Sequence, residues 1–283
     1  QEESASPRGR IALMRQAESS GMVDQTFINF MDACIQCRGC ETACPAGVPF
    51  GSMMETTREA LAQQTPYQPW WRRVAYRVLG WPEILAAGSK MLAILQRFGL
   101  LPSRLTLPKI PLVQTPLVSS GDDVWLFTGC VMDAWMRETH RAVQRVVEAA
   151  GVGVRFPNRK AACCGALHTH AGLGAAARRL AERTIAAFPG EAPILVDSAG
   201  CGAQLKEYGR LLDTPESHEF SKRIFDVHEW LVDHLDALPL SRSRPPRIGI
   251  QDPCHLRHVQ RSHDPVQAVL ARYVEPVILD DDG

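Results

Sequence analysis

The sequence predicts an α + α/β protein, in which an all-helical N-terminal domain precedes an α/β domain with a parallel sheet. Three observations support this class. Four cysteines fall within eleven residues, Cys34–Cys44, between short helical segments. From Asp122 onward, short apolar runs alternate with amphipathic segments, as expected for strands connected by helices. Near residue 250 a strand, a turn and a cysteine recur in the order seen near residue 127, which indicates an internal repeat.

The composition is that of a globular protein without a strong charge bias. The 283 residues are 45% hydrophobic and 22% charged, and Lys+Arg equals Asp+Glu at 31 each. We therefore expect no nucleic-acid partner. Nine cysteines, an odd number, argue against a closed disulfide framework and favour thiolate chemistry in the cytoplasm. The N-terminus lacks a signal-peptide pattern and an initial Met, which is consistent with a fragment of a longer protein.

The first hundred residues predict short helices around the cysteine run. Helices are expected over residues 11–18, 25–33 and 51–62, and Pro45 and Pro49 limit helix at the exit of the run. We expect few strands here. This N-terminal domain is assigned to residues 1–101, including a helical extension.

The run Cys34, Cys37, Cys40, Cys44 and Pro45 has the spacing C-x₂-C-x₂-C-x₃-C-P. This is the bacterial ferredoxin spacing for a [4Fe–4S] cluster, in which the fourth cysteine ligates a second cluster. Zinc is the first alternative, but structural zinc sites take their ligands as two pairs separated by a longer loop. Disulfides are the second, and near neighbours of this kind would be strained. We expect Cys44 to point away from the other three thiols.

Residues 70–110 carry seven cationic residues, Arg104 among them, against one acid, Glu83. One interpretation is a solvated helical face with Trp70 and Trp71 in the core. The other is a docking surface for a partner subunit or for the anionic membrane face. Charged residues interrupt the apolar stretch 84–101, so it predicts an amphipathic helix and not a membrane span. Prolines mark residues 102–121 as a linker.

An α/β domain is expected over residues 122–245, with the first part of a repeat over 246–283. Strands are predicted at 124–127, 151–156 and 193–196, and helices at 133–150 and 171–187, with further helices to about 238. The repeat predicts a strand at 247–250, a helix at 265–273 and a strand at 276–279.

A second group of cysteines, Cys130, Cys163, Cys164 and Cys201, follows the predicted strands. Ligands collect at the carboxyl edge of an open α/β sheet, so three turns there could bring four sulfurs together. The interpretations are a cluster or redox-active thiol site, or buried small hydrophobic residues. Three histidines lie near these cysteines: His168, His170 and His255. Each is expected to be a core residue or to form hydrogen bonds beside a metal site without binding the metal. His170 is the preferred candidate for the second role, because it is expected at the start of a helix.

These residues resemble the iron–sulfur subunit family of bacterial glycolate oxidase over essentially the whole chain. The matching motifs are Ser6–Arg10, Cys34–Pro45, Thr128–Cys130, Cys163–Leu167 with His170, Asp197–Cys201 and Asp252–Leu256. The Cys-Cys-Gly modules, called CCG domains, are also similar to those of heterodisulfide reductase and of lactate-utilisation iron–sulfur proteins. The family carries two ferredoxin motifs and two CCG domains. This chain lacks the first motif and ends before the second Cys-Cys-Gly.

The resemblance implies an oxidoreductase subunit that passes electrons from a flavin subunit to a quinone or another acceptor. The alternative is a heterodisulfide-reductase-like or lactate-utilisation protein with a catalytic CCG cluster. Implied cofactors are two [4Fe–4S] clusters in the full-length protein, a further cluster at the CCG cysteines and FAD on a partner flavoprotein. Cys254 is the implied ligand in the second repeat. The implied location is cytoplasmic, peripheral to the inner face of the membrane.

Overall fold

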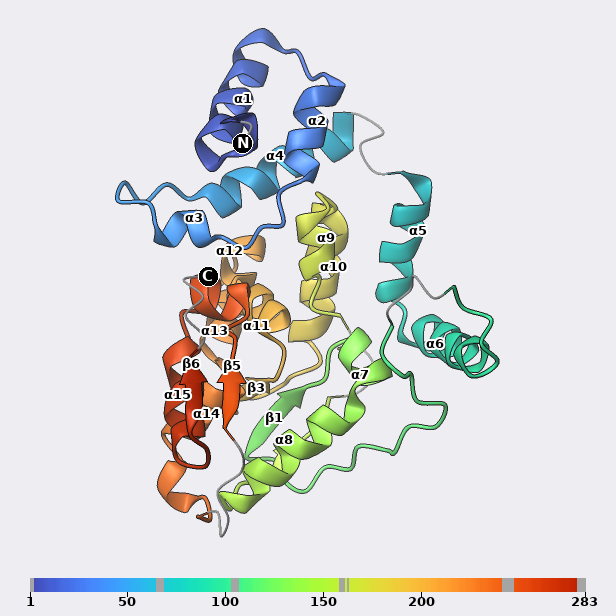
Figure 1. Ribbon diagram of the computed structural model, residues 1–283, viewed down its shortest axis with the longest axis vertical. Coiled ribbons are helices and arrows are strands. Elements are labelled where there is room, and N and C mark those ends of the chain that lie inside the picture. Colours follow the sequence, from blue (N-terminus) through green and yellow to red (C-terminus); the bar gives the residue numbers. More distant parts are fainter. Residues whose placement is uncertain are drawn as a thin grey trace.

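The computed structural model describes residues 3–64, 69–102, 107–157, 161, 163–240 and 247–278. A helical N-terminal part, blue in Figure 1, lies against an α/β part that holds the sheet, and two teal helices lie to one side. Arg104 and the last residue of the strand predicted at 276–279 fall outside the described residues. Part of the predicted linker and the residues around the predicted domain boundary at 245 also fall outside them.

The N-terminal part contains a short 3₁₀ helix and four α-helices. Side chains cap two of these helices, since Ser6 Oγ accepts from Gly9 N at 3.0 Å and Asp24 Oδ1 accepts from Phe27 N at 2.7 Å. Their apolar faces meet in one small core, formed by Phe27, Met31, Phe50, Met54 and Leu61. The elements are η1 (Glu3–Ala5), α1 (Pro7–Ser20), α2 (Gln25–Asp32), α3 (Gly39–Thr42) and α4 (Phe50–Gln64).

The two teal helices are α5 (Trp70–Leu79) and α6 (Pro82–Arg97), which meet at a bend of 107°. Among the described residues no single helix is long and apolar enough to cross a bilayer, and this bent pair meets those criteria only when both helices are taken together. Trp70 is 77% exposed and Trp71 54%. The interpretation that places these tryptophans in the core is therefore wrong, because α5 turns them toward solvent.

The main sheet has four parallel strands in the order β2-β1-β3-β4. Trp125 of the central strand pairs with Ile194 on one side and Arg155 on the other. The strands are β1 (Val124–Phe127), β2 (Val154–Arg155), β3 (Ile194–Val196) and β4 (Ile224–Asp226). The predicted α + α/β class with a parallel sheet is confirmed.

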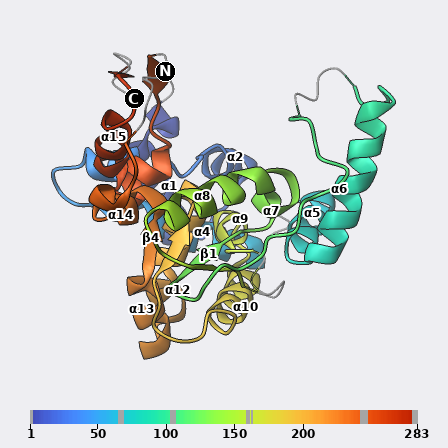
Figure 2. The same cartoon turned by 90° about the horizontal axis from the view of Figure 1, so that it is seen from below.

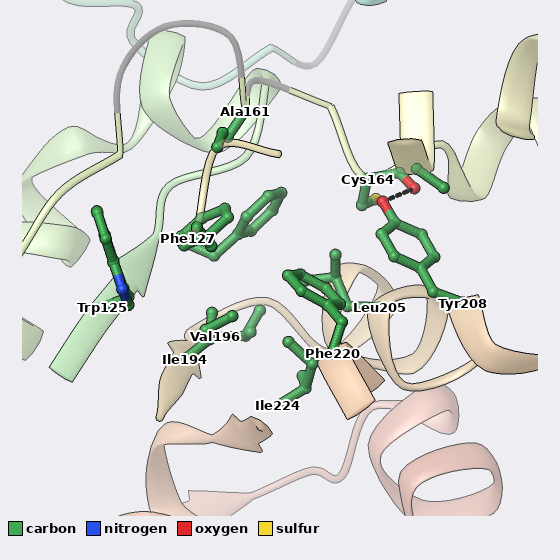
Figure 3. Close-up of a cluster of buried hydrophobic side chains, with 13 residues drawn as sticks. Trp125, Phe127, Ala161, Cys164, Ile194, Val196, Leu205, Tyr208, Phe220 and Ile224 are labelled. Atoms are coloured by element: carbon green, nitrogen blue, oxygen red, sulfur yellow. Dashed lines mark hydrogen bonds between the residues drawn. The ribbon is translucent and has the colours of Figure 1, made fainter. Parts of the chain in front are cut away.

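Side chains alternate between the two faces of this sheet, so each face carries its own core. Trp125 and Phe127 pack with residues of the helices on one face, as Figure 3 shows, whereas Val124 and Leu126 pack with those on the other. The first face is covered by α10 (Gly174–Ile185), α11 (Ala199–Lys206), α12 (Tyr208–Leu212) and α13 (Pro215–Lys222). The second is covered by α8 (Arg137–Ala149), α14 (Val227–Val232) and α15 (His263–Ala271).

The C-terminal strands form a separate parallel pair, β5 (Ile248–Ile250) and β6 (Pro276–Ile278). Between them lie a π-helix, η4 (His255–Gln260), and α15. The order strand, helix, parallel strand matches that of β1, α7 (Val131–Trp135), α8 and β2. The remaining elements are α9 (Ala166–His170) and η3 (Leu235–Ala237).

Several predicted elements differ from the structure. Strand β4 was not predicted. It has only three residues, lies between two helices, and is not marked by turn residues in the sequence. The helix predicted over 133–150 is broken at Met136, and that predicted over 171–187 begins at Gly174. His170 therefore ends α9 and does not start a helix, since Gly172 has a φ of 72° and turns the chain. The motif Asp197–Cys201 follows β3 and enters α11 at Ala199.

A buried arginine joins the two parts of the molecule. Arg58, on α4, is 5% exposed and donates to four backbone carbonyls. Three belong to the N-terminal part: Met31 O at 2.5 Å, Cys34 O at 2.5 Å and Asp32 O at 3.2 Å. The fourth is His170 O on α9, at 2.7 Å. A Cβ at Gly172 would lie 2.2 Å from Arg58 O, so only glycine allows this approach.

We predict that Arg58→Met lowers the free energy of unfolding by about 3 kcal/mol or more, because several buried carbonyls lose their donor. Chemical denaturation of the anaerobically purified protein measures this. Arg97→Met is the matched control, since Arg97 donates to two carbonyls, Ala93 O and Ile110 O, from an exposed position. A change at Arg58 no larger than roughly 0.5 kcal/mol, the range of surface substitutions, would contradict this role.

Candidate functional site

The N-terminal cysteine run forms a tight loop between α2 and α4. Gln36 and Arg38 have φ values of 56° and 60°, which are unfavourable for residues with a Cβ. The loop turns back twice within five residues, and Cys34 and Cys40 pack against the small N-terminal core. Residues held in such conformations concentrate at ligand sites, where the surrounding structure compensates the cost.

Three of the four thiols in this loop act on one another. Burial is the first cause that raises the pKa of Cys40, followed by the charges of Cys37 and Cys34. Cys44 has different neighbours: the backbone N–H groups of Val48, Ala46 and Gly47 lower its pKa. Cys34, Cys37 and Cys40 thus form a group, and Cys44 lies in its own turn with N–H groups directed at the sulfur.

The second group gathers at the carboxyl edge of the main sheet. Cys130 begins α7 after β1, Cys163 and Cys164 precede α9, and Cys201 lies in the first turn of α11 after β3. The thiol of Cys163 donates a hydrogen bond to Cys130, which lowers the pKa of Cys130 to about 7. The same hydrogen bond, burial and the charge of Cys130 raise the pKa of Cys163.

The other two thiols of the group pair in the same way. A hydrogen bond with Cys201, then burial, raises the pKa of Cys164, and the charges of Cys201 and Cys163 add to this. Cys201 also acts on Cys163. These interactions connect four thiols that span residues 130 to 201 of the chain.

Backbone contacts hold this CCG thiol group in place. Tyr208, which is fully buried, donates from its hydroxyl to Cys164 O at 2.8 Å, shown dashed in Figure 3. Thr184 Oγ1 donates to Cys163 O at 3.4 Å. Gly129 has a φ of 69°, and a Cβ there would lie 3.7 Å from Cys201 Sγ. The thiols are thus supported by the same core that packs against the sheet.

One buried polar pair, His140 and Asp197, was not predicted from the sequence. His140, on α8, has its Nδ1 2.5 Å from Oδ2 of Asp197, which follows β3 directly. Within the described residues, His140 Nε2 and Asp197 Oδ1 are buried without a hydrogen-bond partner. His140 lies within a continuous run of polar residues, 137–141, so no spacing signal distinguished it.

His170 and His255 lie between the two thiol groups. Their rings stack with centroids 5.5 Å apart at 29°. Burial, then the charges of His255, Arg58 and Arg38, lowers the pKa of His170 to about 4, so its ring is neutral at neutral pH. Burial and Arg38 lower the pKa of His255 in the same direction. The two histidines come together, and Arg38 acts on both rings, whereas Glu207 acts on His170 in the opposite direction.

Ion pairs close this interface at its outer edge. Arg38 Nη1 lies 2.5 Å from Glu207 Oε1 and its Nε lies 2.6 Å from Glu41 Oε2. Arg210 Nη2 lies 2.5 Å from Glu207 Oε2 and 2.6 Å from Glu55 Oε2. The network links the cysteine loop and α4 to α11 and α12, and it neutralises the charge of Arg38.

Cys254 belongs to the C-terminal unit. It precedes η4 and is exposed. The helix it precedes reaches the cysteine loop, because Thr42 Oγ1 lies 3.0 Å from His258 Nδ1 and a Cβ at Gly39 would lie 3.3 Å from His258 Nε2. The C-terminal unit therefore covers α3.

The donor chemistry of both groups fits an iron–sulfur cluster. Within the described residues, no three Cys, His, Asp or Glu side chains converge on the position of a single metal ion. In a [4Fe–4S] cluster the thiolates surround an iron–sulfide core instead of converging on one ion. Soft sulfur donors that are partly or fully buried select such clusters over ions that prefer oxygen ligands.

Two family models match the chain. Residues 2–49 match a 4Fe-4S dicluster domain, and residues 124–206 match a cysteine-rich domain. The first range contains the Cys34–Cys44 loop, and the second contains the CCG thiol group. No solved structure matches the chain significantly.

Curated relatives match nearly the whole chain. A probable glycolate oxidase iron-sulfur subunit of Bacillus subtilis is 33% identical, over 92% of this chain and 67% of its own length. The glycolate oxidase iron-sulfur subunit of Escherichia coli is 28% identical, over 94% of this chain and 69% of its own length. Lactate utilization protein A of Bacillus pumilus is 25% identical over 49% of this chain and 60% of its own length. With these matches on both domains, the chain belongs to the family of glycolate oxidase iron–sulfur subunits.

Proposed function

We propose that this chain is the iron–sulfur electron-transfer subunit of a flavin-dependent 2-hydroxy acid oxidase that acts on glycolate. The observation that carries the proposal is the pair of thiol groups on either side of one rigid interface, with Arg58 bonded to Cys34 O and to His170 O. The glycolate oxidase relatives support the substrate class. A [4Fe–4S] cluster, when bound, supplies one-electron redox chemistry.

The residues divide between ligand positions as follows. Cys34, Cys37 and Cys40 hold one cluster in this proposal, and Cys44, whose sulfur faces the N–H groups of its own turn, serves another. Cys130, Cys163, Cys164 and Cys201 hold a further cluster. Cys254 would serve only the second CCG repeat, because it is exposed and begins the helix that follows β5.

The chain's own residues set the environment of these sulfurs. Burial excludes water from Cys163 and Cys164, and His170 stays neutral between the two groups. The sequence suggests that Arg38 raises the cluster potential, but Glu41 and Glu207 bind its guanidinium directly. We therefore infer that Arg38 fixes the interface and contributes little net charge to the cluster.

The flavin site is proposed to lie on a partner flavoprotein that carries FAD and oxidises the hydroxy acid. The sequence shows no dinucleotide fingerprint for a flavin of its own. The alternative, reduction of a disulfide at a catalytic CCG cluster, would be favoured by a second cysteine three residues after Cys201. Gln204 occupies that position and is buried, which favours electron transfer.

We predict that Cys164→Ser lowers the iron and labile sulfide bound per chain, because a serine hydroxyl is a poor ligand for iron–sulfur clusters. The measurement is iron and sulfide analysis after anaerobic purification. Met22→Ser, at an exposed apolar residue outside both thiol groups, is the control and should leave both contents unchanged. Equal iron in wild type and in Cys164→Ser would contradict a cluster at the CCG group, and a colourless protein holding only zinc would contradict both clusters.

We predict that glycolate bleaches the visible cluster absorbance only when the partner flavoprotein is present, because hydride transfer requires the flavin. Anaerobic mixing in a stopped-flow spectrometer measures this. Cys37→Ser, which removes a proposed ligand, should slow bleaching with the flavoprotein unchanged. Bleaching by glycolate without the flavoprotein would place the substrate site on this chain.

The exposed face of α5–α6 is proposed to contact the inner face of the membrane, which would bring the subunit to the quinone pool. Aromatic side chains stand outward beside a cation, as at a membrane surface: Trp70, Trp71 and Phe98, with Lys90. Anionic lipid headgroups match this charge, so the occupant we propose is a lipid surface and not a protein.

We predict that the protein floats with phosphatidylglycerol-containing vesicles and that Trp70→Ser with Phe98→Ser reduces the bound fraction severalfold. Flotation on a density gradient measures it. Met22→Ser with Val113→Ser replaces two equally exposed hydrophobic residues elsewhere and should have no effect. Failure of the wild type to float, or equal loss in both variants, would contradict membrane contact.

A further inference from the structure

A cavity of about 670 Å³ lies between α5 and α10, next to α4 and α9. Figures 1 and 2 show α5 beside α9 and α10, and Leu180 of α10 comes within 3.6 Å of a Cβ built at Gly80. The volume is that of a small-molecule site. Neither thiol group lines it, so it is separate from the proposed cluster sites.

The cavity wall is strongly cationic. It contains five arginines, two on α5 and three on α10: Arg73, Arg77, Arg178, Arg179 and Arg183. Glu59 is the only acidic residue among the described lining, and it pairs with Arg178 at 2.7 Å. Within the described residues, Arg73, Arg77 and Arg179 form no ion pair with a carboxylate. Unpaired positive charge at a concave surface attracts an anion.

A buried imidazole reaches the same cavity. His168, on α9, is 3% exposed, and its Nδ1 has no hydrogen-bond partner within the described residues. Burial, opposed by a hydrogen bond between the ring and the backbone of Tyr76, lowers the pKa of His168, so a neutral imidazole stands at the cavity wall. The ring of Tyr76 lies 6.0 Å from that of His168. The site therefore has a buried polar group as well as surface charge.

Apolar and aromatic side chains complete the lining. Tyr76 and Trp81 come from the α5–α6 segment, and Leu173 and Leu180 come from the α9–α10 segment. This surface would contact a carbon skeleton rather than a bare inorganic ion. The ligand should then combine a compact anionic group with an organic body.

We propose that this cavity binds a phosphate ester. The planar guanidinium donates two parallel hydrogen bonds to phosphate oxygens, and several arginines together favour phosphate over a single carboxylate. The ester could come from a soluble organic phosphate or from the headgroup of an anionic phospholipid, since Trp81 and α5 also belong to the exposed face. The proposal does not depend on iron at either thiol group.

The position of the cavity gives its occupant access to the interface between the two parts of the protein. Helix α9 carries His168 toward the cavity and ends at His170, which bonds Arg58. Leu180 lines the cavity, and its Cβ lies 3.7 Å from a Cβ built at Gly165, next to Cys164. A bound ester would thus contact α4, α5, α9 and α10 together.

Isothermal titration of the anaerobically purified chain with phenyl phosphate, and co-sedimentation with vesicles, tests the site. The vesicles are phosphatidylcholine alone or mixed with phosphatidylglycerol. Arg73→Gln with Arg77→Gln should weaken binding by about tenfold or more, because charged hydrogen bonds to phosphate are lost. Arg141→Gln with Arg145→Gln is the control, with the same charge change on α8. His168→Asn should also weaken binding of the same probe.

Each outcome is decisive. Phenyl phosphate binding that requires Arg73 and Arg77 supports the site with a soluble ester. Binding only to phosphatidylglycerol vesicles, lost in Arg73→Gln with Arg77→Gln and also in His168→Asn, supports the site with a lipid headgroup, because His168 is buried in the cavity wall and does not lie on the exposed face of α5–α6. Absence of binding to both probes, or equal weakening in the α8 control, overturns the proposal. Circular dichroism confirms that each variant is folded.

Discussion

The structure depends on the buried guanidinium of Arg58. Its donors satisfy carbonyls at the end of α2, at Cys34 and at His170, so one side chain fixes the entry to the cysteine loop and the end of α9. A buried charge is tolerated only when its hydrogen bonds are made, and here backbone oxygens make them. One side chain thus links the loop that carries the first thiol group to the helix that follows the Cys-Cys-Gly turn.

The parallel sheet brings the second thiol group together. Strands β1 and β3 are neighbours and end at the same edge, so the turn after β1 meets the start of α11: a Cβ at Gly129 would lie 3.7 Å from Cys201 Sγ. The period and position of these strands were evident in the sequence, and so was the ligand spacing at Cys34–Cys44. The sequence did not reveal the role of Arg58, the His140–Asp197 pair or strand β4. Each depends on contacts between segments far apart in the chain, and local sequence patterns do not predict such contacts.

Function is distributed over separate surfaces of the chain. In our account the buried thiol groups carry electrons, and α5–α6 meets the membrane. The arginine-lined cavity between α5 and α10 joins those regions, because its wall includes both the exposed helix and the helix that follows the Cys-Cys-Gly turn. Charge is used differently in each place: Arg38 is neutralised by carboxylates, whereas Arg73 and Arg77 face a cavity.

The most direct test of the account is low-temperature electron paramagnetic resonance of the anaerobically purified chain, before and after reduction with dithionite. The account predicts that reduction produces a rapidly relaxing iron–sulfur signal, altered by magnetic interaction when both thiol groups hold reduced clusters. Contradiction would be a reduced sample without a paramagnetic iron signal, with the thiols bound to zinc or free.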